Sequence, residues 1–507
     1  MRFLSRKLNY WSVRGVNGPK PVPIFGNVLQ LFVKPRPLVE KEWIHKYGKI
    51  YGYYVQNNPI LTIAEPELIK LVLVKNFHLF ADRRHEESSD PIIDNSLTNL
   101  LGDDWKRVRS IVSPTFSSGK MRKMYPMVRQ CLTDFMDHLE VIVGDGEAVE
   151  IDVKQVFGNF TMDVITTCAF ATKTNSHKEL NNPFVVNAKR IFNISALQLI
   201  SLIVLPNFAL KWIESSPINT LQFLIKNVRQ ILAKRRLNKD GDKYNDFVQL
   251  MVDLHKDPHI NDNAITDPND VNEAHHLNEG AEELLVQKKA LNTSNKYMSD
   301  TEILSQALMF LLAGYETTAT ALSASSYELA LNPSVQQKLY EEITAAMDGD
   351  GEIGYEELAK LPFLDAFMSE TLRIHSPAIR VSRLAATDFK LGDTGITIKK
   401  DQMIEVPVYA IHHCEDFYPN AEQFDPDRFM PHNRHKIIPY TYLPFGAGPR
   451  SCIGMRFALM EAKLGLAHIV SKYRFSACTH TDVPLNYKRD LKMTFPKRIV
   501  VAIEKRR

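Results

Sequence analysis

The chain has 507 residues with 44% hydrophobic and 24% charged content, and its 62 basic and 59 acidic residues leave a net charge of +3. This composition excludes a disordered chain, and the balanced charge gives no reason to expect a nucleic-acid partner. The five cysteines are scattered and contain no C-x-x-C pair, which excludes a disulfide framework and a zinc site.

The N-terminal part is charged and rich in proline. The first residues, MRFLSRKLNYWSVRG, contain no apolar run and predict neither a signal peptide nor a membrane span. The stretch GVNGPKPVPIFGN at residues 15–27 is typical of an extended entry segment. We therefore expect a basic, proline-rich hinge over residues 1–27 and a single domain over residues 28–507.

Two strands and then many helices are predicted along the chain. Residues 50–64, IYGYYVQNNPILTIA, indicate two β-strands around a turn at NNP. Helical periodicity dominates residues 65–250 and 299–376, and residues 388–412 combine short β-type runs with glycines. The pattern predicts a mainly α fold with small β-sheets assembled from both ends of the chain.

Two segments interrupt the helical pattern. Residues 255–298 are polar and rich in Asn and Asp, which indicates a solvated insertion or mobile loop. Residues 191–210, IFNISALQLISLIVLPNFAL, carry no charge, but their asparagines, glutamine and proline argue against a membrane span. A buried helix plus loop, or an apolar loop that enters a bilayer from the surface, both remain open for this segment.

One cysteine stands in a glycine-rich loop, FGAGPRSCIG, residues 445–454. The apolar-periodic stretch that follows predicts a long helix, so Cys452 lies near a helix N-terminus, where a thiolate is favoured. The glycines allow the backbone to turn close to the sulfur, and Arg450 adds a cation. A structural cysteine, a nucleophile and a metal-bound thiolate remain as interpretations, and the last accounts for most of these features.

The pattern Phe445-x-x-Gly448-x-Arg450-x-Cys452-x-Gly454 resembles the haem-binding loop of the cytochrome P-450 family. The resemblance implies that Cys452 is the axial ligand of haem iron and that Arg450 and Phe445 lie at the cofactor.

A long helix is predicted over residues 299–331, opened by the capping box Ser299-x-x-Glu302. Its middle, AGYETT, resembles the family's second signature. Ala313 and Thr317 are four residues apart and share a helix face on which a flat cofactor could lie. The resemblance implies that Thr317 and Glu316 deliver protons during dioxygen cleavage. A crossing of helices through small residues is the alternative.

Several arginines match positions that bind the haem propionates in related proteins. The resemblance assigns Trp105 and Arg109 of WKRVR to one propionate. It adds Arg83 and Arg380, for which Arg84 and Arg383 are adjacent alternatives. Buried carboxylates need such cationic partners.

A third motif has a structural role. Glu370-x-x-Arg373 and Arg428 of FDPDRF resemble the family's ion-pair network, which is expected to hold the region beneath the cysteine loop.

The resemblance covers the chain from about residue 15 to its end. The sequence around the motifs is most similar to animal microsomal, xenobiotic-metabolising members. The resemblance implies a single, mainly α cytochrome P-450 domain and a monooxygenase that holds haem b and inserts one oxygen atom of O2 into lipophilic small molecules. The substrate itself is not predicted. By the same analogy the pocket is formed by residues 88–100, 191–215, Phe310, Ala313, 377–382 and 491–495.

The resemblance also implies partners and a location. The expected electron donor is a separate NADPH–cytochrome reductase flavoprotein, and cytochrome b5 is a second candidate donor. The expected docking face contains Lys106, Arg107, Lys120, Arg122 and Lys123. The expected location is the cytosolic face of the endoplasmic reticulum membrane. The apolar anchor usual in such members does not precede the hinge, so we expect either that the chain is incomplete or that membrane contact rests on residues 191–210.

Two alternatives belong to other functional classes. One is a thiolate-haem isomerase or dehydratase, against which the Glu316–Thr317 pair argues. The other is a non-catalytic haem sensor, which would need no proton relay.

Overall fold

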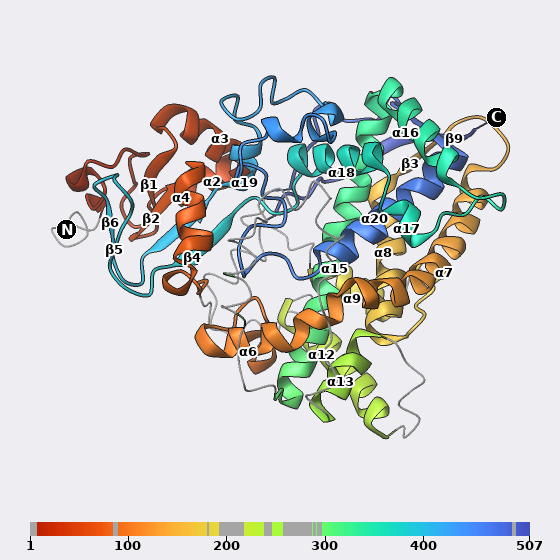
Figure 1. Ribbon diagram of the computed structural model, residues 1–507, viewed down its shortest axis with the longest axis horizontal. Coiled ribbons are helices and arrows are strands. Elements are labelled where there is room, and N and C mark those ends of the chain that lie inside the picture. Colours follow the sequence, from red (N-terminus) through yellow and green to blue (C-terminus); the bar gives the residue numbers. More distant parts are fainter. Residues whose placement is uncertain are drawn as a thin grey trace.

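The computed structural model describes residues 8–84, 90–179, 182–191, 217–237, 246–256, 286, 291, 297–488 and 493–506. Within them, helix α15 (Asp300–Leu331) runs through the middle of the helical part of the molecule (Figure 1). Its N-terminus has the predicted capping box between Ser299 and Glu302.

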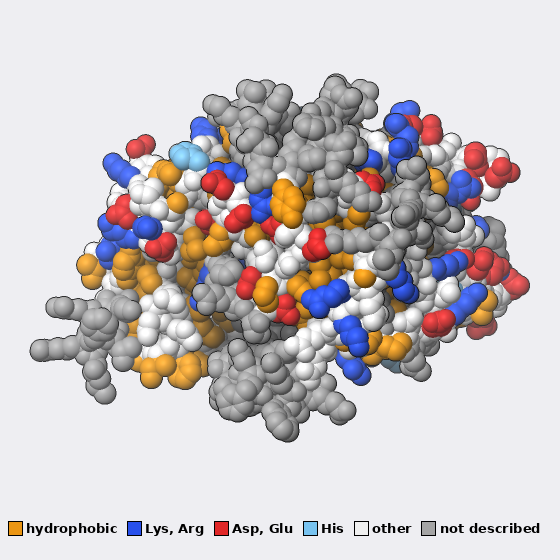
Figure 2. Space-filling model, turned by 90° about the horizontal axis from the view of Figure 1, so that it is seen from below, with side chains coloured by type: hydrophobic (Ala, Val, Ile, Leu, Met, Phe, Trp, Pro, Cys, Tyr) orange, Lys and Arg blue, Asp and Glu red, His pale blue; other side chains and the backbone are white. Residues whose placement is uncertain are grey.

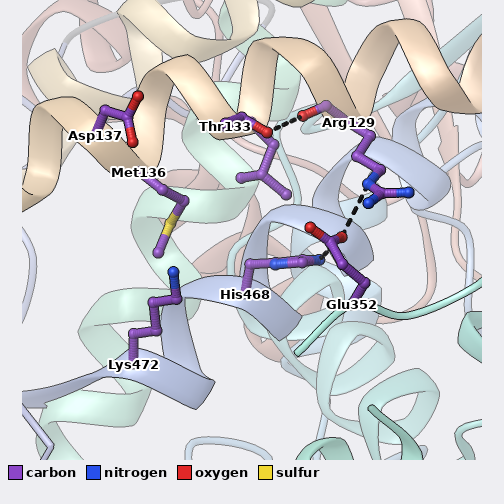
Figure 3. Close-up of a pocket in the computed structure, with 8 residues that line it drawn as sticks. Arg129, Thr133, Met136, Asp137, Glu352, His468 and Lys472 are labelled. Carbon is purple, nitrogen blue, oxygen red and sulfur yellow. Dashed lines mark hydrogen bonds and ion pairs between the residues drawn. The ribbon is translucent and has the colours of Figure 1, made fainter. Parts of the chain in front are cut away.

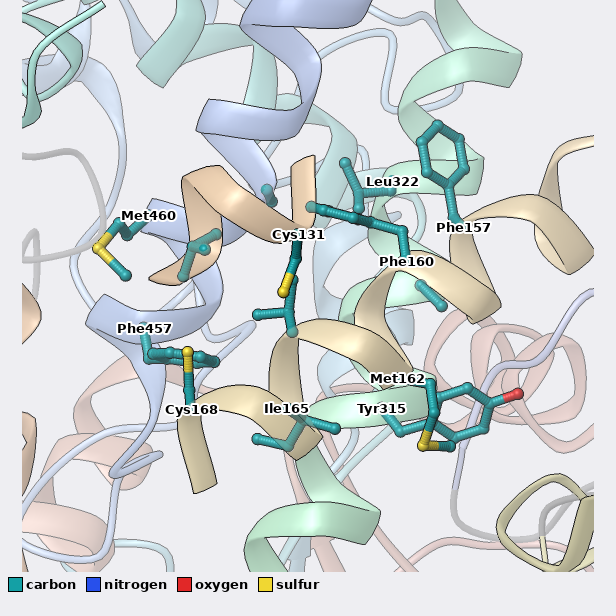
Figure 4. Packing of buried hydrophobic residues seen from close by; sticks show 14 of the residues in the cluster. Cys131, Phe157, Phe160, Met162, Ile165, Cys168, Tyr315, Leu322, Phe457 and Met460 are labelled. Carbon is teal, nitrogen blue, oxygen red and sulfur yellow. The ribbon is translucent and has the colours of Figure 1, made fainter. Parts of the chain in front are cut away.

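Two long helices, α8 (Val153–Phe170) and α20 (Met455–Lys472), pack on α15, and a third, α7 (Ser118–Val143), packs on α8 and α20. Their apolar side chains form one large core, part of which Figure 4 shows. The core includes Cys131 and Cys168, so these two cysteines are packing residues.

The other helices of the described residues are α2 (Val28–Val33), α3 (Arg36–Tyr47), α4 (Pro66–Lys70), α5 (Pro91–Asp94), α6 (Gly102–Val112), α9 (Pro183–Ile191), α12 (Pro217–Leu237), α13 (Phe247–Lys256), α16 (Pro333–Ala346), α17 (Tyr355–Leu358), α18 (Pro362–Ile374) and α19 (Val408–His412). Among them, α2, α3, α4 and α19 contribute to a second core with the largest sheet (Figure 1).

The largest sheet joins the two ends of the chain, as predicted. Its strand order is β1 (Ile50–Val55), β2 (Asn58–Ile63), β7 (Met403–Val406) and β4 (Val381–Leu384). Strands β1 and β2 form an antiparallel hairpin, whose turn lies at Gln56 and Asn57, earlier than predicted, while β7 pairs parallel with β2.

Two smaller sheets complete the β structure. One has the order β3 (Val149–Asp152), β9 (Val500–Lys505), β8 (Tyr473–Ser476), and the other pairs β5 (Phe389–Lys390) with β6 (Thr397–Ile398). The prediction of a mainly α fold with small β-sheets is therefore confirmed.

The N-terminal segment is packed against the first sheet. The Trp11 indole lies against Gly52, where an added Cβ would come within 2.3 Å of the ring, and its Nε1 donates to the carbonyl of Tyr53 at 3.3 Å. The stretch expected to act as a hinge thus shares a hydrophobic core with β1 and β2 from residue 8 onward.

Two of the predicted segments lie mostly outside the described residues, namely 191–210 and 255–298. In the part of the chain that is described, no helix is both long enough and apolar enough to span a bilayer.

Candidate functional site

The cysteine loop is held tightly against the helix Leu71–Lys75. Gly448 has φ 73°, and a Cβ there would lie 2.1 Å from the carbonyl oxygen of Leu73, so only glycine fits. The amide of Cys452 donates to the carbonyl of Phe445 at 2.9 Å and closes the loop. Helix α20 begins three residues later at Met455.

The side chain of Cys452 is surrounded by protein, yet its sulfur is accessible to solvent. The residue has a large accessible surface area, but the protein around it removes bulk water and raises the pKa of its thiol. We interpret the two together as a sulfur that faces a hollow inside the protein. The amide of Gly454 and the charges of Arg109 and Arg83 act in the opposite direction and lower this pKa.

Four arginines gather around this sulfur: Arg83, Arg109, Arg383 and Arg450. Burial lowers the pKa of all four, and for Arg109, Arg383 and Arg450 the charges of neighbouring arginines add to it, giving a pKa of about 10 for Arg109 and about 9 for Arg450. Within the described residues, only Arg450 of the four has an acidic neighbour, Asp82 at 3.8 Å. Such a group of buried cations calls for anions at its centre.

Arg450 is also bound to backbone carbonyls. Its guanidinium donates to Ala81 and, at 2.6 Å, to Leu100, and it lies 4.9 Å from the ring centroid of Trp105. Trp105 is itself buried. Arg450 therefore ties the cysteine loop to the segment that precedes α6.

The structure distinguishes between the adjacent arginines. Arg83 is half-buried and donates to the carbonyl of Arg450 at 3.3 Å, whereas Arg84 is exposed. Arg380 pairs with Glu405 of β7 at 3.2 Å, whereas Arg383 lies in the cluster. Arg83 and Arg383 thus lie in the cluster beside Cys452, and which arginines bind the propionates stays a prediction.

One face of α15 is open in a helix that is otherwise buried almost all round. Ala313 is exposed, Met309, Leu312 and Thr317 are half-buried, and the Thr317 hydroxyl donates to the carbonyl of Ala313 at 2.6 Å. Phe445 of the cysteine loop packs against a cluster that contains Ala321, one turn further along α15. The open face and the cysteine loop therefore adjoin each other.

Phe310, expected to line the pocket, is buried, and its ring contacts Phe116 and Phe247 at centroid distances of 5.1 and 5.7 Å. Its place in the pocket stays a prediction. The half-buried side chains of Met309 and Leu312 lie on the open face.

The side of α15 next to α8 is packed very closely. A Cβ on Gly314 would lie 2.8 Å from Cδ1 of Ile165, and the Thr161 hydroxyl donates to the carbonyl of Tyr315 at 3.0 Å. Figure 4 shows Ile165 and Tyr315 at this contact. Gly314 therefore permits this close packing, and a Cβ there would displace the Ile165 side chain.

Glu316 is buried on the α8 side of α15. Its carboxylate pairs with Nζ of Lys154 at 2.9 Å, and both side chains are largely excluded from solvent. Its role in proton delivery stays a prediction. Lys154 belongs to no motif, and its link to Glu316 depends on tertiary packing.

The predicted ion-pair network of Glu370, Arg373 and Arg428 is assembled in the structure. Glu370 and Arg373 form a buried pair at 2.7 Å, and Nε of Arg428 lies 3.4 Å from Glu370. Arg373 also donates to the carbonyls of His412 and Ala421. The arrangement fits a structural role.

The expected docking face has less free positive charge than predicted. Lys106 pairs with Asp103, Arg107 with Glu302, and Arg122 with Glu356. Lys123 is exposed and Lys120 half-buried.

A small polar pocket lies elsewhere, between α7, the last turns of α20 and the loop before α17 (Figure 3). Arg129 and His468 approach Glu352 there at 2.9 and 3.6 Å. Because His468 and Lys472 are at the far end of α20, this pocket is remote from Cys452, which precedes the helix.

Haem b fits the site around Cys452. A single accessible sulfur can ligate the iron, the uncompensated arginines can bind the two propionates, and the Ala313 face can lie against the flat ring. The Nε atoms of Arg109, Arg383 and Arg450 are buried and have no hydrogen-bond partner among the described residues.

Comparisons with known proteins agree with this interpretation. The family model for cytochrome P450 matches residues 16–502. Cytochrome P450 3A40 of Oryzias latipes is 36% identical over 480 residues, covering 93% of this chain and 88% of that protein. Cytochrome P450 3A5 of Homo sapiens is 34% identical over 501 residues, covering 97% and 91%. The resemblance found in the sequence is confirmed, and the chain belongs to the cytochrome P450 family of haem-thiolate monooxygenases.

Proposed function

We propose that this monooxygenase oxidises lipophilic small molecules, such as xenobiotics, steroids or fatty-acid-like compounds, at the endoplasmic reticulum membrane. The observation that supports the site is the accessible sulfur of Cys452, surrounded by buried arginines and adjoining the open face of α15. The apolar side chains of Met309 and Leu312 on that face favour an apolar substrate.

When bound, thiolate-ligated haem supplies dioxygen activation, which the electron-rich sulfur promotes. Among the arginines, Arg109, Arg83 and Arg383 hold the propionates, while Arg450 fixes the loop. Arg380 remains the less favoured alternative to Arg383, since it already has Glu405 as a partner.

On the open face, Thr317 holds the proton-delivery position. Its hydroxyl is bonded to Ala313 at rest and is free to turn toward a water in the hollow. Glu316 lies one residue earlier and resupplies protons. Such acid–base assistance is typically worth ~10²–10⁴-fold in rate.

The redox partner is a separate reductase, and we propose the NADPH–cytochrome reductase flavoprotein, with cytochrome b5 as a second donor. Exposed Lys123, near the start of α7, is the part of the expected docking face most open to an acidic partner. Membrane contact through residues 191–210 on the cytosolic face belongs to the same proposal.

The first experiment tests whether Cys452 is the ligand of the haem iron. The reduced protein with carbon monoxide should show the long-wavelength band typical of a thiolate ligand. Cys452→Ser should abolish this band, whereas Cys478→Ser, the matched control at a half-buried cysteine, should keep it. A band retained in both variants would place the ligand elsewhere.

A second measurement separates the alternatives. Oxidation of lipophilic probes that depends on added reductase is expected of a monooxygenase. An isomerase or dehydratase would turn over peroxides without reductase, and a sensor would bind ligands without turnover.

A further inference from the structure

Lys154 connects the acid of α15 to the C-terminal segment of the chain. Its Nζ lies 2.9 Å from Oε1 of Glu316 and donates to the carbonyl of Pro496 at 3.0 Å. The same ammonium is 5.3 Å from the ring centroid of Phe495, which is buried. Lys154 therefore contacts both α15 and the C-terminal segment, which are far apart in the sequence.

The position of Lys154 is itself well defined. The residue is in the first turn of α8, where the Asp152 carboxylate accepts from its amide at 3.1 Å. Asp152 also accepts from the amide of Ile499 at 3.3 Å, and Val153 donates to the carbonyl of Ile499. The start of α8 and the C-terminal segment are thus one packed unit.

The C-terminal segment also reaches the region predicted to line the substrate pocket. The amide of Thr494 donates to the carbonyl of Pro377 at 2.8 Å, and Met493 forms a β-bridge with Ala378. A continuous path of contacts therefore runs from the residues after α18, through the C-terminal segment and Lys154, to Glu316.

In the described part of the chain, two lysines face Glu316. Besides Lys154 of α8, Lys189 of α9 lies within electrostatic range of Glu316 and donates to Asn159 at 2.7 Å. Asp163 of α8 is the other acid near Lys189. The Lys154 contact combines the acid with the C-terminal segment.

We propose that Lys154 is a positioning residue that holds the Glu316 carboxylate on the α8 side of α15 and makes its release depend on the C-terminal segment. The inference rests on the proposed role of Glu316 in proton delivery. To serve the open face, the carboxylate has to leave Lys154. A substrate that displaces the segment at Met493 or Thr494 also moves the Pro496 carbonyl, which accepts from Nζ of Lys154. The ion pair between Lys154 and Glu316 then changes in strength.

Three variants separate positioning from mere stability. Lys154→Met removes the ion pair between this residue and Glu316. The pH profile of product formed per nicotinamide cofactor consumed should then differ from that of wild type by roughly tenfold, within the range of acid–base effects. Lys154→Arg should restore the wild-type profile, and the double variant K154M/E316Q should show the ratio of Glu316→Gln alone.

The control removes another buried lysine. Lys463 pairs with Asp365 at 3.0 Å and is as well buried. Lys463→Met should lower the unfolding temperature without changing the pH profile of the product ratio.

A readout independent of turnover completes the test. Hydrogen–deuterium exchange of the amides of residues 493–499 should be faster in K154M than in wild type, and unchanged in K463M and in Thr317→Ala. Unchanged exchange together with a wild-type pH profile in K154M would overturn the inference. If Glu316→Gln and Thr317→Ala left the product ratio unchanged, the proposed function of the pair would fail instead, while faster exchange would still support the structural link.

Discussion

Arg380 and Arg383 are close in sequence but have different surroundings. Arg383 lies among like charges near Cys452, and burial and the charges of Arg83 and Arg450 lower its pKa well below its ordinary value. Arg380 is compensated by Glu405. The two side chains therefore offer a direct test of which arginine serves the cofactor.

We expect Arg383→Leu to weaken haem retention by roughly 10- to 100-fold, since a hydrogen bond to a charged group is worth about 1.5–3 kcal/mol. The same variant should raise the stability of the haem-free protein, because it removes one of four repelling cations. Haem transfer to an acceptor protein and thermal unfolding measure the two effects.

The control is Arg380→Leu, which should lower stability because it leaves Glu405 with one partner fewer. Faster haem loss from R380L than from R383L would return the assignment to Arg380.

A second residue, Glu461 of α20, predicts a dependence on pH. It is buried, neither carboxyl oxygen has a hydrogen-bond partner among the described residues, and burial raises its pKa well above the ordinary value. In the unfolded chain the same group ionises above a pH of about 4.3.

Between that pH and the raised pKa, the folded state therefore binds one proton more than the unfolded state, and this group makes stability fall as pH rises. We expect the unfolding temperature of Glu461→Gln, relative to wild type, to increase progressively from pH 5 to pH 7. Two curves that stay parallel over this range would contradict the proposed protonation.

At the scale of elements, the contact between α15 and α8 depends on one missing side chain. Gly314→Ala would place a Cβ 2.8 Å from Cδ1 of Ile165, and overpacking of this kind typically costs about 1–3 kcal/mol. We expect G314A to lower the unfolding temperature and Ile165→Val, which removes Cδ1, to restore much of the loss in the double variant. If I165V gave no rescue, the glycine would be needed for another reason.

The same scale shows what could be predicted from sequence. The cysteine loop, the capped helix α15 and the β1–β2 hairpin depend on local patterns, and they were predicted nearly to the residue. The choice between Arg380 and Arg383 depends on how β4 is placed beside β7, and Lys154 reaches Glu316 only through the packing of α8 on α15. The placement of Phe310 was taken from analogy, whereas its neighbours Phe116 and Phe247 come from distant segments.

At the scale of the whole molecule, one end has hydrophobic side chains on its surface. Large apolar residues of the N-terminal segment are exposed, and Figure 2 shows hydrophobic side chains gathered at the end of the molecule that holds this segment. They are Val13, Val22, Ile24, Phe25, Leu29 and Val33. Such a patch fits a lipid surface and is a second candidate for membrane contact, in addition to residues 191–210.

Flotation with liposomes compares the two surfaces. Replacing Leu202 and Ile203 with aspartate should release the protein, because charges in lipid cost several kcal/mol. The variant I24D/F25D should weaken flotation less. Full flotation of the first variant would exclude residues 191–210 as the main contact.

The four arginines around Cys452 also bear on how a cell makes this protein. A newly made chain has to bring these cations together, and the carboxylates of haem relieve their repulsion, so cofactor binding stabilises the fold by mass action. Biosynthesis is thereby tied to the supply of haem: a cell short of it should degrade much of the new chain, and feeding a haem precursor during expression should raise the yield of intact protein.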